Sequence, residues 1–150
     1  MGLDVGTKTV GIALSDPLQM TAQPHSTLRY QSEGEAHKKI LSLIRLEEVE
    51  TIVAGLPLNM HGTEGPQAAF VRKFIEILKK SPAATKTNFV FWDERLSSVG
   101  AERVLLEADL SRAKRKKVID KMAAVFILQG YLDSRPKGAP SGPTTAGMTF

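Results

Sequence analysis

The sequence predicts a single α/β domain built on a mixed sheet of five strands, three antiparallel strands followed by parallel ones, with helices on its faces. Residues 3–14 alternate apolar and small side chains around a Gly-Thr-Lys-Thr turn, which predicts a β-hairpin. Later in the chain, short apolar runs alternate with stretches of helical spacing, as in parallel strands joined by crossover helices. In such sheets, the site is expected at the carboxyl ends of the parallel strands.

The first half of the chain supplies the antiparallel unit and the first crossover. After a short turn, residues 26–30 predict an edge strand with Pro24 at its start. Residues 33–46 place apolar side chains at helical spacing, and residues 51–57 form a continuous apolar run that suits a central parallel strand. The order strand, helix, strand therefore begins here.

The second half repeats this alternation. A Gly-rich loop over residues 59–67 precedes a helix whose apolar face ends near residues 79–80. Residues 88–95 predict another apolar strand, which terminates in charged residues. Two further helices are expected, one with its apolar face over residues 101–108 and a longer one over residues 113–132.

Composition limits the class of protein. The 150 residues suit one core, so we expect one domain over residues 1–133 and a flexible Pro/Gly-rich tail over residues 134–150. The absence of cysteine excludes disulfides, thiolate zinc sites and a cysteine nucleophile. No apolar run is as long as a bilayer span, so we expect a cytoplasmic protein with no membrane contact. A net charge of +4 favours a polyanionic partner.

Two acidic positions are expected to meet at one edge of the sheet. Asp4 lies within a largely buried strand, where a carboxylate loses several kcal/mol of hydration unless a cation holds it. Asp93 and Glu94 follow the strand of residues 88–92, and period-two alternation lets only one of them face Asp4. We prefer Glu94, because Asp93 can then pair with Arg95. Taken alone, Asp4 reads as a turn residue and the acidic pair as a solvated strand end.

A third acid lies on the last helix. Asp120 begins an i, i+3, i+4, i+7 stripe that contains Ala123, Ala124, Ile127, Leu128 and Tyr131. The two alanines are small enough for the helix to approach the sheet and bring Asp120 towards Asp4. Taken alone, Asp120 could instead pair with Lys117 or Lys121. Carboxylates gathered in one place repel one another unless hard cations compensate, so we predict Mg²⁺ or Mn²⁺, two ions, and hydrolysis at phosphorus.

A basic run, SRAKRKK over residues 111–117, precedes Asp120. It packs five cations at the start of the last helix, where they oppose the helix dipole, so local stability does not require them. The ordinary interpretation is a solvated helical turn, and the alternative is a contact with a phosphate backbone. The candidate nucleic-acid contacts are Lys8, Arg95, Arg112, Lys114, Arg115, Lys116 and Lys117.

The remaining residue types that could carry chemistry give weaker signals. His25, His37 and His61 lack metal-ligand spacing and are expected at the surface or in loops, with His61 placed in the Gly-rich loop where it could touch substrate. The pair Ser97-Ser98 has no evident His-Asp partners, which argues against a serine nucleophile. The aromatic residues of the 88–95 strand, Phe91 and Trp92, are expected in the core.

Four blocks of the chain resemble the YqgF/RuvX family, RNase H-like proteins described as Holliday junction resolvases and as pre-16S rRNA nucleases. They are GLDVGTKTVGIALSDP, VAGLPLNMHGTEGP, DERLSSVGAERVLLEA and KRKKVIDKMAAVFILQGYLD, in the family's order from Gly2 to Asp133. The resemblance implies an RNase H-like fold, divalent-metal-dependent nuclease chemistry, and metal-binding acids at Asp4, Glu94 and Asp120.

The chain departs from related patterns at two places. Family members usually carry a few more apolar residues before GLDVGTK, so the first strand looks clipped. RNase H-like enzymes outside the family commonly place an acid at the end of the fourth strand, where this chain has Gly55-Leu56-Pro57. Glu94 must then substitute for that acid.

Several functions remain open at this point. The first is a nuclease that processes the 5′ end of pre-16S rRNA, and the second is a resolvase of branched DNA junctions; structured RNA or branched DNA would be the partner. A non-catalytic nucleic-acid-binding module ranks lower. An actin-like phosphate-binding protein also begins with an Asp-x-Gly-Thr hairpin, but it needs two such lobes and this chain holds one. We expect a monomer or a weak homodimer.

Overall fold

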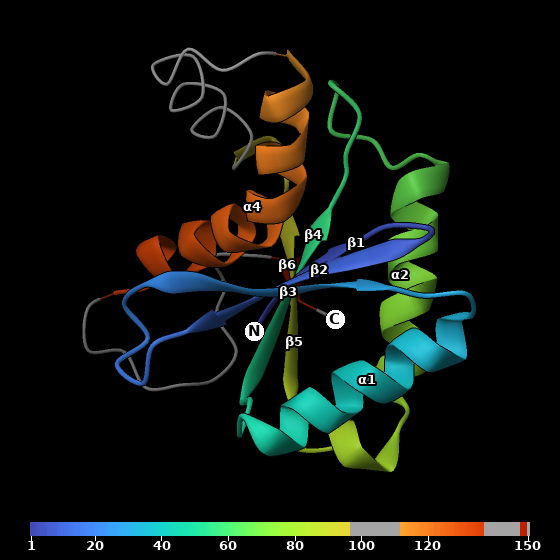
Figure 1. The fold of residues 1–150 in the computed structure, drawn as a ribbon, viewed down its shortest axis with the longest axis vertical. Helices are drawn as coiled ribbons and strands as arrows, with labels where there is room; N and C mark the ends of the chain where they lie inside the picture. The colour runs from blue at the N-terminus through green and yellow to red at the C-terminus, as the bar shows by residue number, and fades with distance from the viewer. Residues whose placement is uncertain (97–111, 137–147, 150) are drawn as a thin grey trace.

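The computed structural model describes residues 1–96, 112–136 and 148–149 (Figure 1). The predicted helix over residues 101–108 and the pair Ser97-Ser98 lie outside this part of the chain. In chain order the elements are β1 (Gly2–Val5), β2 (Thr9–Ser15), β3 (Ala22–Arg29), α1 (Glu33–Leu46), β4 (Thr51–Leu56), α2 (Pro66–Lys79), the 3-10 turn η1 (Pro82–Ala84), β5 (Asn88–Asp93), α4 (Arg112–Ser134) and β6 (Met148–Thr149).

The strands form one sheet in the order β3-β2-β1-β4-β5-β6. β1, β2 and β3 are antiparallel neighbours, whereas β4 pairs with β1 and β5 with β4 in parallel. The predicted mixed sheet of five strands is thereby confirmed. The short strand β6 adds a sixth, antiparallel to β5, and consists of residues that the sequence assigns to the tail.

The edge strand β3 is longer than its sequence pattern predicts. It begins at Ala22 instead of residue 26, so Pro24 lies inside the strand. Pro24 is tolerated because β3 is at the edge of the sheet and because the register shifts there, with Ile12 opposite Ser26 and Ala13 opposite Pro24. Edges and bulges are the positions in a sheet where a residue without an N–H does least harm.

Two layers of apolar side chains cover the two faces of the sheet. α1 and α2 pack on one face and α4 on the other, as Figure 1 shows. Alternation along the strands sorts the side chains: Phe89 and Phe91 of β5 belong to the core under α1 and α2, whereas Val90 and Trp92 belong to the core under α4. The expectation that Phe91 and Trp92 are core residues is confirmed.

The expectation for His37 is wrong. It lies on α1 and is only 8 % exposed, instead of at the surface. Its ring stacks on Phe74 of α2 with 4.2 Å between ring centroids, and its Nε2 makes a 3.0 Å hydrogen bond to the Phe74 carbonyl oxygen. Because that carbonyl satisfies the polar nitrogen, the imidazole can be buried between the two helices.

α1 and α2 otherwise have the predicted faces. Ile40 and Ile44 of α1 are buried, and so are Val71 and Ile75 of α2. α1 starts at Ser32, whose hydroxyl accepts a hydrogen bond from the backbone N–H of Glu35, as expected of an N-cap residue. Among the helices of the described residues, none is both long enough and apolar enough to cross a bilayer.

Candidate active site

The strand alternation places Asp4 on the α4 face of the sheet. Its neighbours Leu3 and Val5 are buried in the core under α1 and α2, so the Asp4 side chain points to the opposite face. On β1 the same face is occupied by Gly2, against which α4 packs. Asp4 itself is partly exposed, so the carboxylate lies at the rim of the α4 interface.

Glu94 comes to the same face from the end of β5. It continues the row of Val90 and Trp92, which lie under α4. Its backbone N–H donates to the carbonyl oxygen of Leu56 at 3.3 Å, so the pairing with β4 extends to this residue. Its carboxyl is hydrogen-bonded to that of Asp4. The structure therefore brings together the two acids for which the sequence predicted a meeting.

A glycine in β4 makes the room for this side chain. A Cβ atom at position 55 would lie 2.6 Å from Oε1 of Glu94 and 2.4 Å from Cδ1 of Ile127. Both distances are shorter than real contacts, so a side chain at position 55 would force the ends of Glu94 and Ile127 to move, and glycine leaves them in place. From the sequence, we considered Gly55 only because related enzymes carry an acid at the end of this strand. A glycine inside a strand is itself a sign that another group approaches the backbone closely.

The two carboxyls share an environment that disfavours a second charge. Burial raises the pKa of Glu94 from 4.5 to about 7, and the negative charge of Asp4 adds to the effect, as do the hydrogen bond to Asp4 and the charge of Asp93. Near neutral pH, the Glu94 carboxyl thus keeps a proton for a large part of the time. Because a carboxyl with a pKa of about 7 is about half ionised at pH 7, Glu94 adds only part of a second negative charge beside Asp4.

Asp93 points the other way and has the opposite electrostatics. Its carboxylate receives hydrogen bonds from Arg95, at 2.7 Å between Nη2 and Oδ2 and at 3.0 Å from Nε to Oδ1. The Arg95 hydrogen bonds hold the pKa of Asp93 below its usual value. Two adjacent carboxyls thus differ because alternation sends one against an acid and the other to a guanidinium.

Arg95 also reaches the loop that follows β4. Its Nη1 donates to the carbonyl oxygen of Met60 at 3.4 Å. The same guanidinium lies close to Gly62, whose φ of +82° is a conformation that glycine adopts most easily. The sequence placed Arg95 among the candidate nucleic-acid contacts, and a single sequence offers no signal for this second role.

α4 lies directly on the sheet beside these acids. A Cβ at Gly2 would be 2.7 Å from the Ala124 carbonyl oxygen and 2.8 Å from Cβ of Leu128, so the predicted close approach is present. Ala124, Ile127, Leu128 and Tyr131 of the predicted stripe are buried. Asp120 precedes Ala124 by about one helical turn, on the same face of the helix backbone.

The side chains of Asp120, Arg112 and residues 115–117 lie outside the described part of the structure. Within the described residues, no three His, Cys, Asp or Glu side chains are grouped closely enough to hold a metal ion. Lys114 on α4 and Lys8 in the β1–β2 turn are both exposed.

These positions define one edge of the molecule. The start of α4 and the loop between β4 and α2 rise on the same side of the sheet, at the carboxyl ends of the parallel strands (Figure 1).

A comparison with protein-family models matches residues 1–134 to the model described as RuvX: Holliday junction resolvase. The chain belongs to the RuvX family.

Two relatives align with almost the whole chain. A protein of Clostridium botulinum (strain Hall), named "Putative pre-16S rRNA nuclease", is 51% identical over 137 residues, which are 91% of this chain and 98% of that protein. One of Clostridioides difficile (strain 630) with the same name is 54% identical over 133 residues, which are 89% of this chain and 92% of that protein.

Among solved structures, this RuvX-family chain is similar to RuvC. Thermus thermophilus RuvC in complex with a Holliday junction substrate matches with a TM-score of 0.56 at 11% identity, over 89% of this chain and 94% of the RuvC chain. A second structure, described as that of Thermus thermophilus RuvC alone, matches with a TM-score of 0.50. At this identity the similarity establishes a shared RuvC-like fold, which confirms the predicted fold class.

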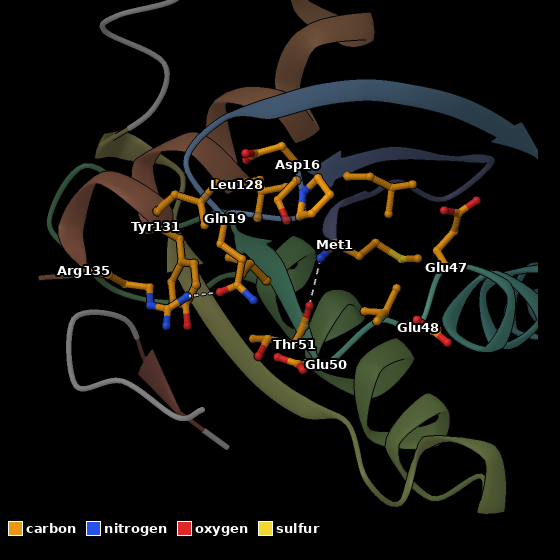
Figure 2. A pocket seen from close by; sticks show the side chains of 16 residues that line it. Met1, Asp16, Gln19, Glu47, Glu48, Glu50, Thr51, Leu128, Tyr131 and Arg135 are labelled. Atoms are coloured by element: carbon orange, nitrogen blue, oxygen red, sulfur yellow. Dashed lines mark hydrogen bonds between the residues drawn. The ribbon is translucent and has the colours of Figure 1, made fainter. Parts of the chain in front are cut away.

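The cavity that the structure shows lies at the opposite edge of the sheet (Figure 2). Its volume is about 460 Å³, and it opens beside Met1 at the start of β1 and Thr51 at the start of β4. The Met1 ammonium donates to the Thr51 carbonyl oxygen at 2.8 Å, and burial lowers its pKa to about 5. The rim carries the carboxylates of Asp16, Glu47, Glu48 and Glu50. Four carboxylates make this an acidic cavity, although Arg135 also lines it, and it lies apart from Asp4 and Glu94.

Proposed function

We propose that this protein is a divalent-metal-dependent nuclease that processes pre-16S rRNA in the cytoplasm. The observation that carries the proposal is the Asp4–Glu94 pair, two hydrogen-bonded carboxyls from different strands at the carboxyl edge of the parallel strands. A structural role would not require two acids of like charge to meet there, since each raises the cost of ionising the other. The RNA assignment follows the names of the two clostridial relatives.

The donor chemistry fits a hard cation. Carboxylate oxygens are the ligands that Mg²⁺ and Mn²⁺ take, and a bound cation would offset the burial and the Asp4 charge that raise the pKa of Glu94. Asp4 and Glu94 would hold the metal, with Asp120 as the third ligand from α4. When bound, one or two such ions polarise a phosphodiester and lower the pKa of a water molecule.

The protein's own side chains prepare this chemistry. Burial and the charge of Asp4 favour the protonated form of Glu94, and binding of a cation requires that this proton leave. Ile127 packs over Gly55 and so shields one side of the glutamate from water. Asp93 is kept ionised by Arg95 and turned away, which leaves Glu94 as the acid of this pair that faces the site.

Exposed cations near this edge would bind the substrate backbone. Lys8 and Lys114 are exposed, and Arg95 sits next to Glu94 with its guanidinium towards the β4–α2 loop. Arg112 and residues 115–117 add cations in the same stretch of α4. Such contacts neutralise phosphates and position the strand without reading its sequence.

The test uses labelled precursor 16S rRNA ends and a four-way DNA junction, each with Mg²⁺, Mn²⁺ or a chelator. Wild type should cleave the RNA only with metal, and Asp4→Asn should lose cleavage while it still binds RNA. Glu48→Gln is the matched control, since it removes a carboxylate from the cavity at the opposite edge. Cleavage by Asp4→Asn at the wild-type rate would remove Asp4 from the mechanism.

The second candidate is junction cleavage, which the description of the matching family model favours. Metal-dependent cleavage of the four-way junction, with the RNA left intact, would select it. Binding of either nucleic acid without cleavage under any metal condition would instead identify a non-catalytic module.

A further inference from the structure

The loop between β4 and α2 carries an unusual side chain at its tip. Met60 is 93 % exposed, which is the largest exposure among the large apolar side chains of the described residues. Leu96, the second residue after Glu94, is 66 % exposed. Single exposed apolar residues are common on protein surfaces, so exposure alone carries no meaning. The way the loop is held is what distinguishes Met60.

The loop is closed by its own hydrogen bonds. Leu58 and Glu64 form a β-bridge, and Asn59 N–H donates to the Thr63 carbonyl oxygen at 2.8 Å. The Asn59 side-chain amide donates to Thr63 Oγ1 at 3.0 Å, and Gly62 N–H donates to the Asn59 carbonyl oxygen at 2.8 Å. Residues 58–64 thus form a small hairpin that presents Met60 outward.

Two arginines anchor this hairpin to the rest of the molecule. On one side Arg95, fixed by Asp93, donates to the Met60 carbonyl oxygen. On the other side Glu64 is paired with Arg72 of α2, whose guanidinium lies 4.7 Å from the centre of the Phe91 ring. The tip is therefore held in place before any ligand arrives, which reduces the entropy lost on binding.

The anchor also fixes where the tip lies. Arg95 follows Glu94 directly, so the Met60 carbonyl is within the reach of one arginine side chain from the candidate metal ligands. The tip and the carboxylates both lie at the carboxyl ends of the parallel strands, so a strand of nucleic acid bound at the carboxylates would extend over the same end of the sheet as the tip. Apolar side chains such as methionine are used by proteins as wedges that separate neighbouring bases, and the bases of single-stranded RNA are free to be splayed out.

We propose that Met60 packs against an unstacked base of the substrate RNA next to the bond that is cleaved, with residues 58–64 as its rigid support. The thioether is polarisable and adapts to any base face, so the contact favours unpaired RNA over duplex without selecting a sequence. This inference rests on the proposed function, because it assumes that the strand is held at Asp4 and Glu94.

The test compares Met60→Ala with wild type on a pre-16S rRNA end. Because Met60 is exposed, its truncation should leave the fold unchanged. Met60→Leu keeps an apolar side chain at the same position. Met20→Ala is the matched control, because Met20 is also an exposed methionine, at 59 %, but lies between β2 and β3 beside the acidic cavity. One readout is kcat/KM, and the other is the fluorescence of 2-aminopurine placed in turn at each nucleotide that flanks the mapped cut.

We expect wild type, Met60→Leu and Met20→Ala to raise the fluorescence at one position, as an unstacked base does. Met60→Ala should show no rise in fluorescence, and its kcat/KM should fall about fivefold. That factor is expected when roughly half of a methionine side chain no longer packs against a base. Equal signals and rates for Met60→Ala and wild type would overturn the inference and leave the nuclease intact. No cleavage by wild type would overturn the proposed function as well.

Discussion

Replacement of Glu94 by glutamine should make the metal-free protein more stable at alkaline pH. The pKa of the folded state, about 7, lies above the ordinary value of 4.5. Folding therefore favours the protonated acid, and stability is lost as the pH rises from the unfolded pKa through the folded one. The shift corresponds to about 3 kcal/mol when the group is fully ionised. Glutamine has the same size, carries no charge and can still donate a hydrogen bond to Asp4.

The assay is thermal or urea unfolding of both proteins with a chelator between pH 5 and pH 8. Glu94→Gln and wild type should differ little at pH 5 and by about 3 kcal/mol at pH 8, which for a chain of this size is about 6–12 °C in Tm. Addition of Mg²⁺ or Mn²⁺ at pH 8 should stabilise wild type and close much of the gap, because a cation bound to the ionised carboxylates favours the folded state.

The result that would refute this reasoning is a difference that does not change with pH, or a glutamine variant that is less stable than wild type at pH 8. Either would mean that the carboxyl is not held in its neutral form by burial and by Asp4. The metal-dependent part fails separately if Mg²⁺ and Mn²⁺ stabilise both proteins equally.

Three further changes test the neighbouring features. Asp93→Asn should lower the stability at neutral pH, which is the opposite of the effect of Glu94→Gln. The loss should vanish in acid, because Arg95 stabilises only the ionised form of Asp93 and so lowers its pKa. Gly55→Ala should lower the cleavage rate and cost about 1–3 kcal/mol, because its methyl would displace the ends of Glu94 and Ile127. Gly34→Ala, with nothing within 4 Å, should instead gain about 0.4–1 kcal/mol in the same unfolding assay. The double change Lys114→Ala with Arg115→Ala should lower the slope of log affinity against log salt by about one unit for each phosphate that the variant no longer binds, and an unchanged slope would assign both residues to solvent.

Local pattern alone was enough to predict most of the fold. α1 occupies the predicted residues 33–46, and β1 and β2 form the predicted hairpin. The preference for Glu94 over Asp93 came from period-two alternation, and the structure places the two side chains as that rule requires. These features depend on the order of neighbouring residues, so a single sequence is sufficient to predict them.

Other features depended on contacts between segments far apart in the chain. His37 could be buried only because the Phe74 carbonyl, 37 residues away, satisfies its ring nitrogen. β3 runs through Pro24 because it lies at the sheet edge and because its register on β2 shifts at that point. The link from Arg95 to Met60 joins two loops that share no local pattern. None of these contacts is visible in the periodicity of the sequence, because each depends on how the helices, strands and loops pack together.

The candidate site shows the same division. The sequence determined that an acid interrupts a buried strand, that another ends a parallel strand, and that α4 carries small residues on its inner face. Only the tertiary structure decided that Gly55 leaves the space in which Glu94 meets Asp4, and that burial, with the charge of Asp4 second, raises the pKa of Glu94 to about 7. The reason is physical: alternation fixes the direction of a side chain, whereas burial and charge depend on what packs against it.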